Sequence, residues 1–268
     1  MSTAVIARGL LRKNQQEFII RRLQNRDIPE LYGLHKLILS NLHPDQQQFI
    51  HHKSRTDFQN MLDNPNQLLI GAFVGDKLIG YSSANFINQR NMDNVLPGFN
   101  LNYNPEEIVV LEQASVNPAY RGNNLASIMN AARQKIAFQE YGRRYAVTMV
   151  DIHNYYSYRN ALRNGMCITQ AAIDPEDNGH IVYLSKDIAN PPRFNAQNMP
   201  LAVAYNEMNI ATVSVLLKNN YVAHSFDDER GEVIFSYTDS FDNSRKIRHY
   251  KNENQMRETC ALMNGEGR

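Results

Sequence analysis

The stretch from Val116 to Ala126 combines residue types that suit the binding of phosphate. It follows an apolar run at 108–111 that is typical of a β-strand, and it opens the apolar periodicity of a helix over 125–141. The first N–H groups of a helix lack intrahelical partners, and the helix dipole adds positive charge there. Gly122 permits close approach of the backbone, and Arg121 supplies a charge-assisted donor. The segment predicts a phosphate-binding turn; an ordinary strand–loop–helix without a ligand is the alternative.

Glu112 is a second candidate for chemistry because it lies in the strand before that turn. Strict alternation places Val110, Glu112, Ala114 and Val116 on one face of the strand. A carboxylate on an otherwise apolar face is unusual, and burial would raise its pKa. Glu112 is therefore a candidate for acid–base chemistry. A salt-bridged structural glutamate and a residue at the sheet edge are the alternatives.

Other patterns that carry chemistry are missing from the sequence. The histidines at 43, 51 and 52 lie in a polar region, and no cysteine or acid spacing completes a zinc site with them. There is no Gly-x-Ser-x-Gly, no Walker loop and no pair of catalytic carboxylates. Lysine and arginine form no stripe with interleaved aromatic residues. We therefore expect no metal and no nucleic-acid partner.

The elements around these residues follow from hydrophobic periodicity, turn signals and helix caps. Asp27 is expected as the N-cap of the first helix and Gly142 as the C-cap of the helix over 125–141. We expect strands at 17–23, 68–74, 77–84, 107–116, 144–150, 166–171 and 180–184, and helices at 28–40, 56–62, 125–141 and 154–163. This order predicts a mixed α/β fold with a partly parallel sheet.

Together these features resemble the GNAT superfamily, the GCN5-related N-acetyltransferases. The turn follows that family's pattern, Gln/Arg-x-x-Gly-x-Gly/Ala preceded by Val-x-Pro, at Val116, Pro118, Arg121 and Ala126. Asn124 occupies the position of the central glycine, and asparagine is the residue that best tolerates the left-handed conformation after glycine. The resemblance covers residues 17–188 and implies the GNAT fold.

The resemblance also implies acetyl-CoA as co-substrate and assigns site residues. The pyrophosphate would lie on Arg121, Gly122, Asn123, Asn124, Leu125 and Ala126. A bulged strand that diverges from its parallel neighbour would offer the backbone N–H groups of Ala114, Ser115 and Val116 to the pantetheine arm and the thioester carbonyl. On the helix at 154–163, Asn154 and Ser157 match the family motif, and Asn154 would contact the pantetheine arm.

The same resemblance gives roles to two proton carriers. Glu112 would accept the proton of the substrate ammonium. The family's tyrosine acid falls on Ala161, so Tyr158, one turn earlier on the same helix face, is the replacement. Tyr155 and Tyr156 are further options, and the alternative is that the three tyrosines pack against other residues or face solvent.

The resulting prediction is an N-acetyltransferase that moves an acetyl group from acetyl-CoA to a primary amine by direct attack in a ternary complex. The alternative is a catalytically weak GNAT module that binds acyl-CoA for sensing or partner regulation. The acceptor is open among a small amine, an antibiotic, a peptide N-terminus and a protein lysine. The polar regions 40–56 and 88–105 are expected to line its site.

The amino-acid composition limits the classes of protein to which this sequence can belong. The 268 residues are 43% apolar and 21% charged with a net charge of +1, which fits a globular domain without a polyanionic partner. No apolar run approaches the ~20 residues of a membrane span. The two cysteines, Cys167 and Cys260, are far apart and suggest a reducing, cytoplasmic compartment, with Cys167 as a buried structural thiol.

The ends of the chain are expected to lie outside the GNAT-like domain at 17–188. Residues 1–16 are expected as a disordered or docked arm rather than a targeting signal. A linker at 189–199 precedes a small unit at 200–238, whose helix and strands resemble the closing elements of the fold. Duplication and chance similarity both explain this repeat, and the unit is expected to pack on the main sheet or to form a homodimer. A polar tail follows at 239–268.

Overall fold

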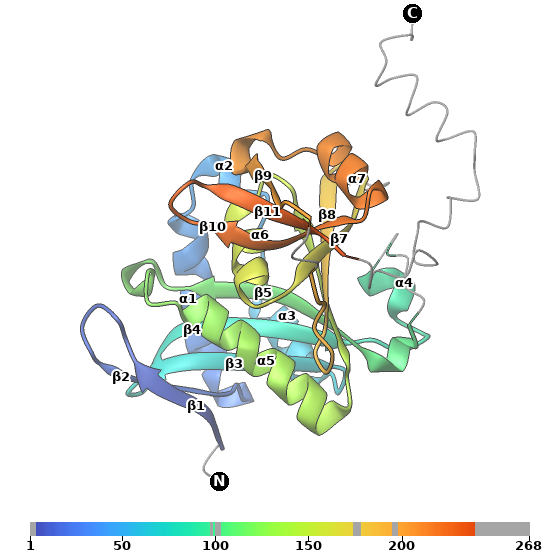
Figure 1. The fold of residues 1–268 in the computed structure, drawn as a ribbon. Helices are drawn as coiled ribbons and strands as arrows, with labels where there is room; N and C mark the ends of the chain where they lie inside the picture. The colour runs from blue at the N-terminus through green and yellow to red at the C-terminus, as the bar shows by residue number, and fades with distance from the viewer. Residues whose placement is uncertain (1–3, 97–98, 100–102, 174–177, 195–197, 239–268) are drawn as a thin grey trace, which may run out of the picture.

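The computed structural model describes residues 4–96, 99, 103–173, 178–194 and 198–238. These residues form one mixed sheet of 11 strands in the order β1-β2-β3-β4-β5-β6-β8-β7-β10-β11-β9 (Figure 1). The strands are β1 Val5–Leu10, β2 Glu17–Arg22, β3 Gln67–Val74, β4 Lys77–Phe86, β5 Ile108–Val116, β6 Tyr145–Asp151, β7 Cys167–Ile173, β8 His180–Asp187, β9 Leu201–Ala204, β10 Tyr221–Asp227 and β11 Glu232–Tyr237. The helices are α1 Ile28–Ser40, α2 Pro44–Gln47, α3 Arg55–Asp63, α4 Met92–Val95, α5 Leu125–Tyr141, α6 Tyr155–Arg163 and α7 Ile210–Lys218. The expected mixed α/β fold is confirmed.

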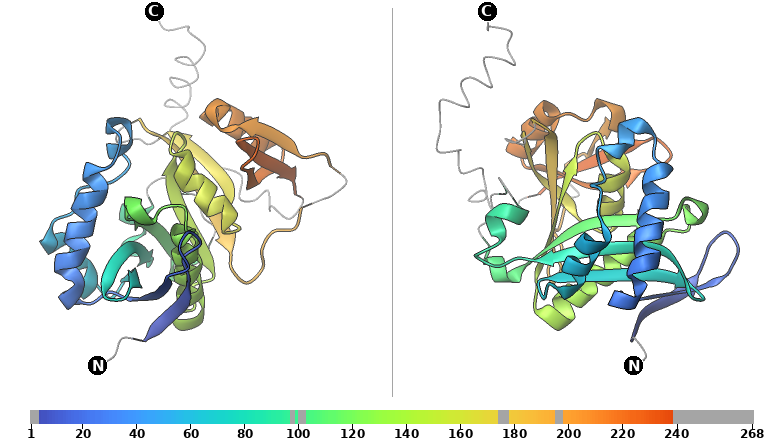
Figure 2. Two further views of the ribbon diagram at one scale, coloured as in Figure 1. Left: turned by 90° about the vertical axis from the view of Figure 1, so that its left-hand side faces the viewer. Right: turned by 180° about the vertical axis from the view of Figure 1, so that it is seen from behind.

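Helices cover both faces of the strands β3–β5. On one face α5 packs over β3, β4 and β5, and on the other α1 and α3 pack over the same strands (Figure 2). The α5 face buries a large apolar cluster that includes Ile79, Leu111 and Met129. The opposite face buries a smaller cluster around Leu31 and Phe58. No helix in the described ranges has the length and apolar character needed to cross a membrane.

The N-terminal arm is docked as a strand. β1 pairs antiparallel with β2 at the edge of the sheet, and Leu11 is fully buried beyond it. Gly9 lies directly on the ring of Phe18, where a Cβ atom would come within 2.8 Å of the ring carbons. The chain therefore turns back at residues 11–16, and this turn reaches the start of α5, as described below.

Two expected helix caps have different outcomes. Gly142 ends α5 in the left-handed conformation, at φ 65°, so that expectation is confirmed. Asp27 occupies the N-cap position of α1 but makes no side-chain cap. Its carboxylate instead accepts hydrogen bonds from Arg21 and from the backbone N–H of Gln24, at 2.7 to 2.8 Å. The nearby guanidinium of Arg21 therefore ties the carboxylate to β2.

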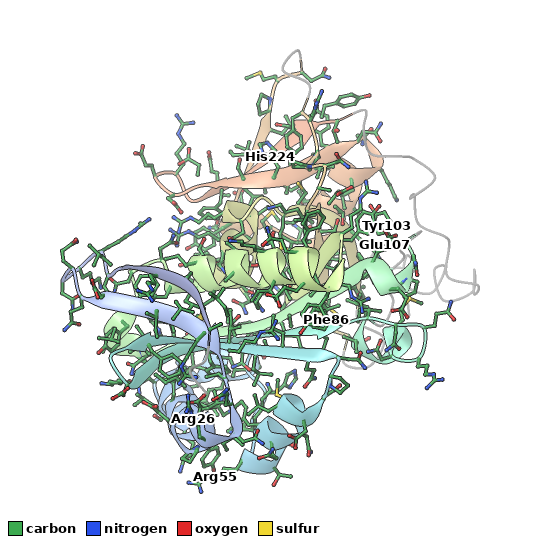
Figure 3. All side chains as sticks on the ribbon, turned by 90° about the horizontal axis from the view of Figure 1, so that it is seen from below. Arg26, Arg55, Phe86, Tyr103, Glu107 and His224 are labelled. Carbon is green, nitrogen blue, oxygen red and sulfur yellow. The ribbon has the colours of Figure 1, made fainter. Side chains whose placement is uncertain are left out.

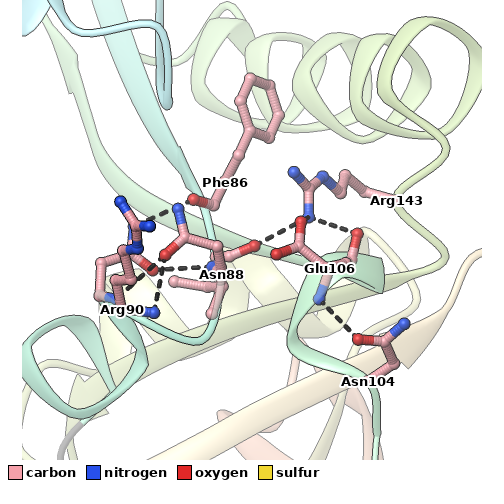
Figure 4. A network of polar contacts seen from close by, with 8 residues as sticks. Phe86, Asn88, Arg90, Asn104, Glu106 and Arg143 are labelled. Carbon is pink, nitrogen blue, oxygen red and sulfur yellow. Dashed lines mark hydrogen bonds and ion pairs between the residues drawn. The ribbon is translucent and has the colours of Figure 1, made fainter.

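Arg143, directly after α5, fastens the loop that precedes β5. Its guanidinium donates to the carbonyl of Ile87 at 2.8 Å and to the carbonyl of Glu106 (Figure 4). Asn104 caps the short turn at Pro105–Glu107 by accepting from the N–H of Glu106 at 3.1 Å. These contacts set where β5 begins relative to β6.

The C-terminal unit continues the sheet of its own chain. Its elements β9, α7, β10 and β11 repeat the order of β6, α6, β7 and β8, and the strand order β6-β8-β7-β10-β11-β9 reads the same from both ends. β7 and β10 meet antiparallel at Ile168 and Ala223, which are equivalent positions of the sequence repeat. Helix α6 packs on β10 and helix α7 packs on β7, so the two halves exchange helix contacts.

The two halves also share local details at equivalent positions. Each helix has an asparagine N-cap that accepts from the N–H three residues later. Each first strand has a bulge at the same place, and each hairpin carries a polar side-chain bond across its strands at this point. The equivalent pairs are Asn154 with Asn209, the bulges at Ile168/Gln170 and Ala223/Ser225, and Thr169–Ser185 with His224–Ser236. Figure 3 shows His224 at the end of the molecule opposite Arg26 and Arg55.

Because this unit shares the main core, it should unfold together with the main domain. Phe235 is fully buried in the large cluster. Phe235→Ala should lower the free energy of unfolding by about 3–5 kcal/mol, since it leaves a cavity. Val215→Ala on the exposed face of α7, where Val215 is 59% exposed, should change it by less than about 0.5 kcal/mol. Chemical denaturation followed by circular dichroism measures both, and a separate transition shifted by Phe235→Ala alone would contradict the shared core.

Candidate functional site

A β-bulge in β5 organises the centre of the site. Ser82 pairs with Ala114 and Ala84 pairs with Leu111, so Glu112 and Gln113 together oppose the single residue Ser83. Two consecutive side chains of β5 consequently point to the same face, the one covered by α1 and α3. The bulge that the family resemblance implied is present.

The bulge corrects the expected alternation along β5. Val110 lies in a cluster with Tyr145 and Val147, but Val116 packs against the large cluster on the α5 face. Glu112 and Val116 therefore do not share a face, because the extra residue shifts the phase of every side chain that follows it.

Arg133 of α5 holds the bulge from the other face. Its side chain is 1% exposed, and its guanidinium donates to the carbonyl of Glu112 at 3.1 Å and to the carbonyl of Ser83. Burial lowers the pKa of Arg133 to about 9, and the negative charge of Glu112 counteracts this shift. The sequence did not single out Arg133, since a charged residue within a helix is usually solvent-exposed.

Glu112 is a half-buried carboxylate on a central strand. Its Oε2 accepts from the hydroxyl of Ser83 at 3.1 Å, and its Oε1 accepts from the side-chain amide of Asn85. Burial raises the pKa of Glu112, while Ser83 and the positive charges of Lys53, Arg133 and His51 lower it. β5 lies between β4 and β6, so Glu112 is not at a sheet edge. The described residues place no cation within ion-pair distance of it, so the structural salt bridge does not account for it.

A buried polar chain runs from α1 to the bulge. The backbone N–H of Lys53 donates to Nε2 of His35 at 3.0 Å, so Nδ1 carries the ring proton and donates to the hydroxyl of Tyr81 at 2.7 Å. Gln113 donates to the same hydroxyl at 2.7 Å and to the hydroxyl of Ser115 at 2.8 Å. The carbonyl oxygen of the Gln113 side chain accepts from Nζ of Lys53 at 2.9 Å. Sequence reasoning missed this chain, because its members are distant along the sequence.

The predicted phosphate turn has the backbone that such a turn requires. Asn117 caps a short 3₁₀ turn by accepting from the N–H of Ala119 at 3.0 Å. Gly122 and Asn124 both have positive φ, 82° and 61°, and α5 starts at Leu125 directly after them. Asn124 therefore keeps the left-handed conformation in place of the family's glycine, as expected. Its side chain caps no N–H group, and Arg121 is exposed.

Lys13 is a residue of this turn that the sequence did not indicate. It lies in the loop between β1 and β2, and its backbone N–H donates to Oδ1 of Asn123 at 3.0 Å. A Cβ atom on Gly122 would lie 3.0 Å from Nζ of Lys13. An ammonium group thus lies over the glycine of the predicted phosphate turn. No local signal in the sequence could have indicated this, since the contact joins the N-terminal arm to the start of α5.

The strands on either side of the predicted pantetheine position diverge. β5 and β6 pair in parallel only over Ile108–Val110, so the backbone from Leu111 to Val116 has no strand partner on the β6 side among the described residues. This segment includes the predicted N–H donors Ala114, Ser115 and Val116. The divergence implied by the resemblance is present.

Helix α6 begins beside this gap with the predicted asparagine as its cap. Oδ1 of Asn154 accepts from the N–H of Ser157 at 3.3 Å, and Ser157 itself is exposed. Tyr158 is fully buried, and its hydroxyl has no hydrogen-bond partner among the described residues. Burial and the nearby hydroxyls of Tyr155 and Tyr205 raise the pKa of Tyr158. The phenol therefore stays protonated at neutral pH.

The sequence model of the family described as "Acetyltransferase (GNAT) family" matches residues 29–166, which is more than half of the chain. The chain belongs to the GNAT acetyltransferase family. The match contains the bulge, the phosphate turn and α6, whereas Lys13 and the C-terminal unit of this GNAT protein lie outside it. No curated protein matches the chain in sequence.

Several solved structures are similar to this GNAT chain. The GNAT domain of PAT from S. lividans is 16% identical with a TM-score of 0.52, covering 68% of this chain and 96% of that one. The PaiA N-acetyltransferase from Thermoplasma acidophilum in complex with coenzyme A is 16% identical, with a TM-score of 0.46 and coverages of 62% and 97%. NAA60 from Arabidopsis thaliana in complex with acetyl-CoA is 15% identical, with a TM-score of 0.49 and coverages of 65% and 99%. At 16% identity the similarity to the S. lividans domain shows the fold alone.

The His35 contact makes a prediction about acid stability. Burial lowers the pKa of His35 to about 4, so the folded state binds fewer protons than the unfolded state between that pH and about 6.5. Stability from neutral His35 is complete above about pH 6.5 and is lost as the pH falls toward 4. The advantage of wild type over His35→Gln in unfolding free energy should therefore shrink by roughly 2 kcal/mol between pH 7 and pH 4.5. Urea denaturation at the two pH values measures it, and an unchanged advantage would show that His35 does not titrate as described.

Proposed function

We propose that this chain transfers an acetyl group from acetyl-CoA to a primary amine by direct attack of the amine in a ternary complex. The bulge of β5 is the observation that supports this most strongly, because it presents the Glu112 carboxylate beside a backbone segment without a strand partner. Together these provide a proton acceptor and N–H donors on neighbouring positions of one strand. Acetyl-CoA supplies the activated thioester.

The residues present fit acetyl-CoA at three points. The turn of Gly122 and Asn124 presents backbone N–H groups at the start of α5, and Lys13 adds a positive charge over it. The divergence of β5 from β6 leaves the backbone after Val110 without a strand partner on that side among the described residues, and we assign the pantetheine arm to this position, next to the N–H groups of Ala114, Ser115 and Val116. The unpartnered hydroxyl of Tyr158 supplies a donor on α6, whose N-terminal residues Asn154 and Ser157 carry the family motif.

Glu112 is assigned as the general base. Its raised pKa makes it a better proton acceptor than an exposed carboxylate, and its bonds to Ser83 and Asn85 hold it in place. The backbone N–H groups after the bulge are assigned to the carbonyl oxygen, where preorganised donors favour the transition state. Tyr158, protonated at neutral pH, is assigned as the proton donor to the departing thiolate.

The surroundings of Cys167 suit a reducing, cytoplasmic setting. The thiol is free and buried, and burial raises its pKa to about 12, so it does not react as a nucleophile. Cys260 and the polar tail lie outside the described residues.

Replacing the base should separate catalysis from binding. Glu112→Gln should lower kcat by about 10²-fold or more and change the Kd for acetyl-CoA little. In wild type, kcat/KM should rise with pH as Glu112 loses its proton, and this limb should be absent in the variant. Release of free thiol and calorimetry measure the two quantities, with Glu229→Gln in the exposed β10–β11 turn as control. Equal turnover in Glu112→Gln would remove Glu112 from the mechanism, and binding without turnover in wild type would favour a sensing module.

Lys13 should contribute to the binding of the phosphate groups. Lys13→Met should raise the Kd for CoA about 5- to 10-fold, because it removes a charged group next to Gly122. The difference should shrink at higher ionic strength, since the lysine is exposed. Calorimetric titration with CoA at two salt concentrations tests this. The exposed Lys135 of α5 gives the matched control Lys135→Met, and equal Kd values for both variants would exclude the role.

A further inference from the structure

Lys53 brings an ammonium group to the acceptor side of the bulge. It lies between α2 and α3, directly before Ser54, the N-cap of α3. Its Nζ reaches β5 and donates to the side chain of Gln113 at 2.9 Å. Gln113 follows Glu112 in the bulge and shares its face. The ammonium of Lys53 is therefore bound by the residue of β5 that directly follows the Glu112 carboxylate.

Hydrogen bonds fix Lys53 both at its backbone and at its side-chain ammonium. Its backbone N–H is held by the buried His35 at 3.0 Å, and its amide partner Gln113 is held in turn by Tyr81 at 2.7 Å. Tyr81 and His35 are each 1% exposed, so the support is rigid. A long cationic side chain loses conformational entropy when it is held in this way. The fold therefore holds this charge in place although doing so lowers the conformational entropy of the side chain.

The ammonium group of Lys53 has N–H donors that its contact with Gln113 does not use. An ammonium has three N–H donors, and the contact with Gln113 uses one of them. The described residues place no carboxylate within 4.0 Å of Nζ. Burial lowers the pKa of Lys53, while Glu112 and Asp57 counteract this shift. The remaining donors of Lys53 are available to an anionic group.

The charges around the bulge restrict the acceptor. Glu112 attracts an ammonium, whereas Lys53 on the same face and Arg133 behind it repel a second positive charge. A polyamine would bring two positive charges to this place and gain only one favourable contact. An amine that also carries an anion would match both groups. Charged groups of this kind discriminate between ligands by several-fold to many-fold in affinity.

We infer that the acceptor is a small amino acid, a molecule with a primary amine and a carboxylate a few bonds apart, and that Lys53 binds its carboxylate while Glu112 accepts its proton. The inference rests on the proposed transfer reaction and adds the class of acceptor to it. Lys53 is assigned here as a substrate-binding residue that determines specificity.

Paired acceptors test the assignment. Each of a panel of amino acids is compared with its own carboxamide, which keeps the amine and replaces the carboxylate by a neutral group, and with a diamine of similar length. Release of CoA from acetyl-CoA gives kcat/KM. Wild type should favour the amino acid over its carboxamide by about 10-fold or more, mainly through KM, as expected for loss of a charged contact.

Variants show whether Lys53 is the cause. Lys53→Met should abolish the preference, Lys53→Arg should keep part of it, and the exposed control Lys135→Met should keep all of it. An equal preference in wild type and Lys53→Met, or faster reaction of the carboxamides, would overturn the assignment and leave the transfer reaction standing. If none of the tested amines causes wild type to release CoA from acetyl-CoA, the proposed transfer fails. Calorimetry of the same pairs on CoA-saturated protein then decides the assignment, because equal binding of acid and amide would overturn it.

Discussion

The hydrogen bonds from Arg133 to the backbone of the bulge are the contacts on which the site depends. A strand that gains one residue must leave carbonyl groups without ladder partners, and a guanidinium can donate to two such groups at once. The charge that performs this role also lies across the strand from Glu112, so one side chain supports both the geometry and the electrostatics of the carboxylate. Without a donor at this position, a regular strand would satisfy its backbone better and would turn Gln113 away from the face of Glu112.

Burying so many polar groups is costly, and the arrangement of the site reflects that cost. The polar chain through His35, Tyr81 and Gln113 is satisfied by its own members, which is the condition under which a buried network is tolerated. The hydroxyls of Tyr158 and Ser82 and Nε of Arg133 are the exceptions near the site within the described part of the chain. In the proposed reaction, rigid polar support behind Glu112 and Lys53 would present the acceptor with charges already in position, so that little reorganisation would accompany its binding.

Sequence reasoning predicted what local periodicity and caps determine. The bounds of α5, its Gly142 cap and the β3–β4 hairpin all follow from neighbouring residues, and the structure confirms them. The family motif also predicted the left-handed backbone of Asn124 before α5, and the binding of phosphate at this turn stays a prediction. The features of the site that the sequence did not predict depend on contacts between segments that are distant along the chain. The docking of Lys13 on the turn requires the N-terminal strand to pair with β2, and Arg133 becomes a buried donor only because the bulge exposes carbonyl groups to it.

The palindromic order of the closing strands has a consequence for how the protein can change. In a symmetric dimer a substitution alters both sides of the interface at once. Here the two sides of the β7–β10 junction are encoded separately, so each can vary while the other is kept. His224, which stacks on Phe194 at 4.1 Å, occupies the place that Thr169 holds in the first half. The closing strands of this one chain thus have the architecture of a two-fold assembly, and the second half is free to acquire a different surface without disturbing the first.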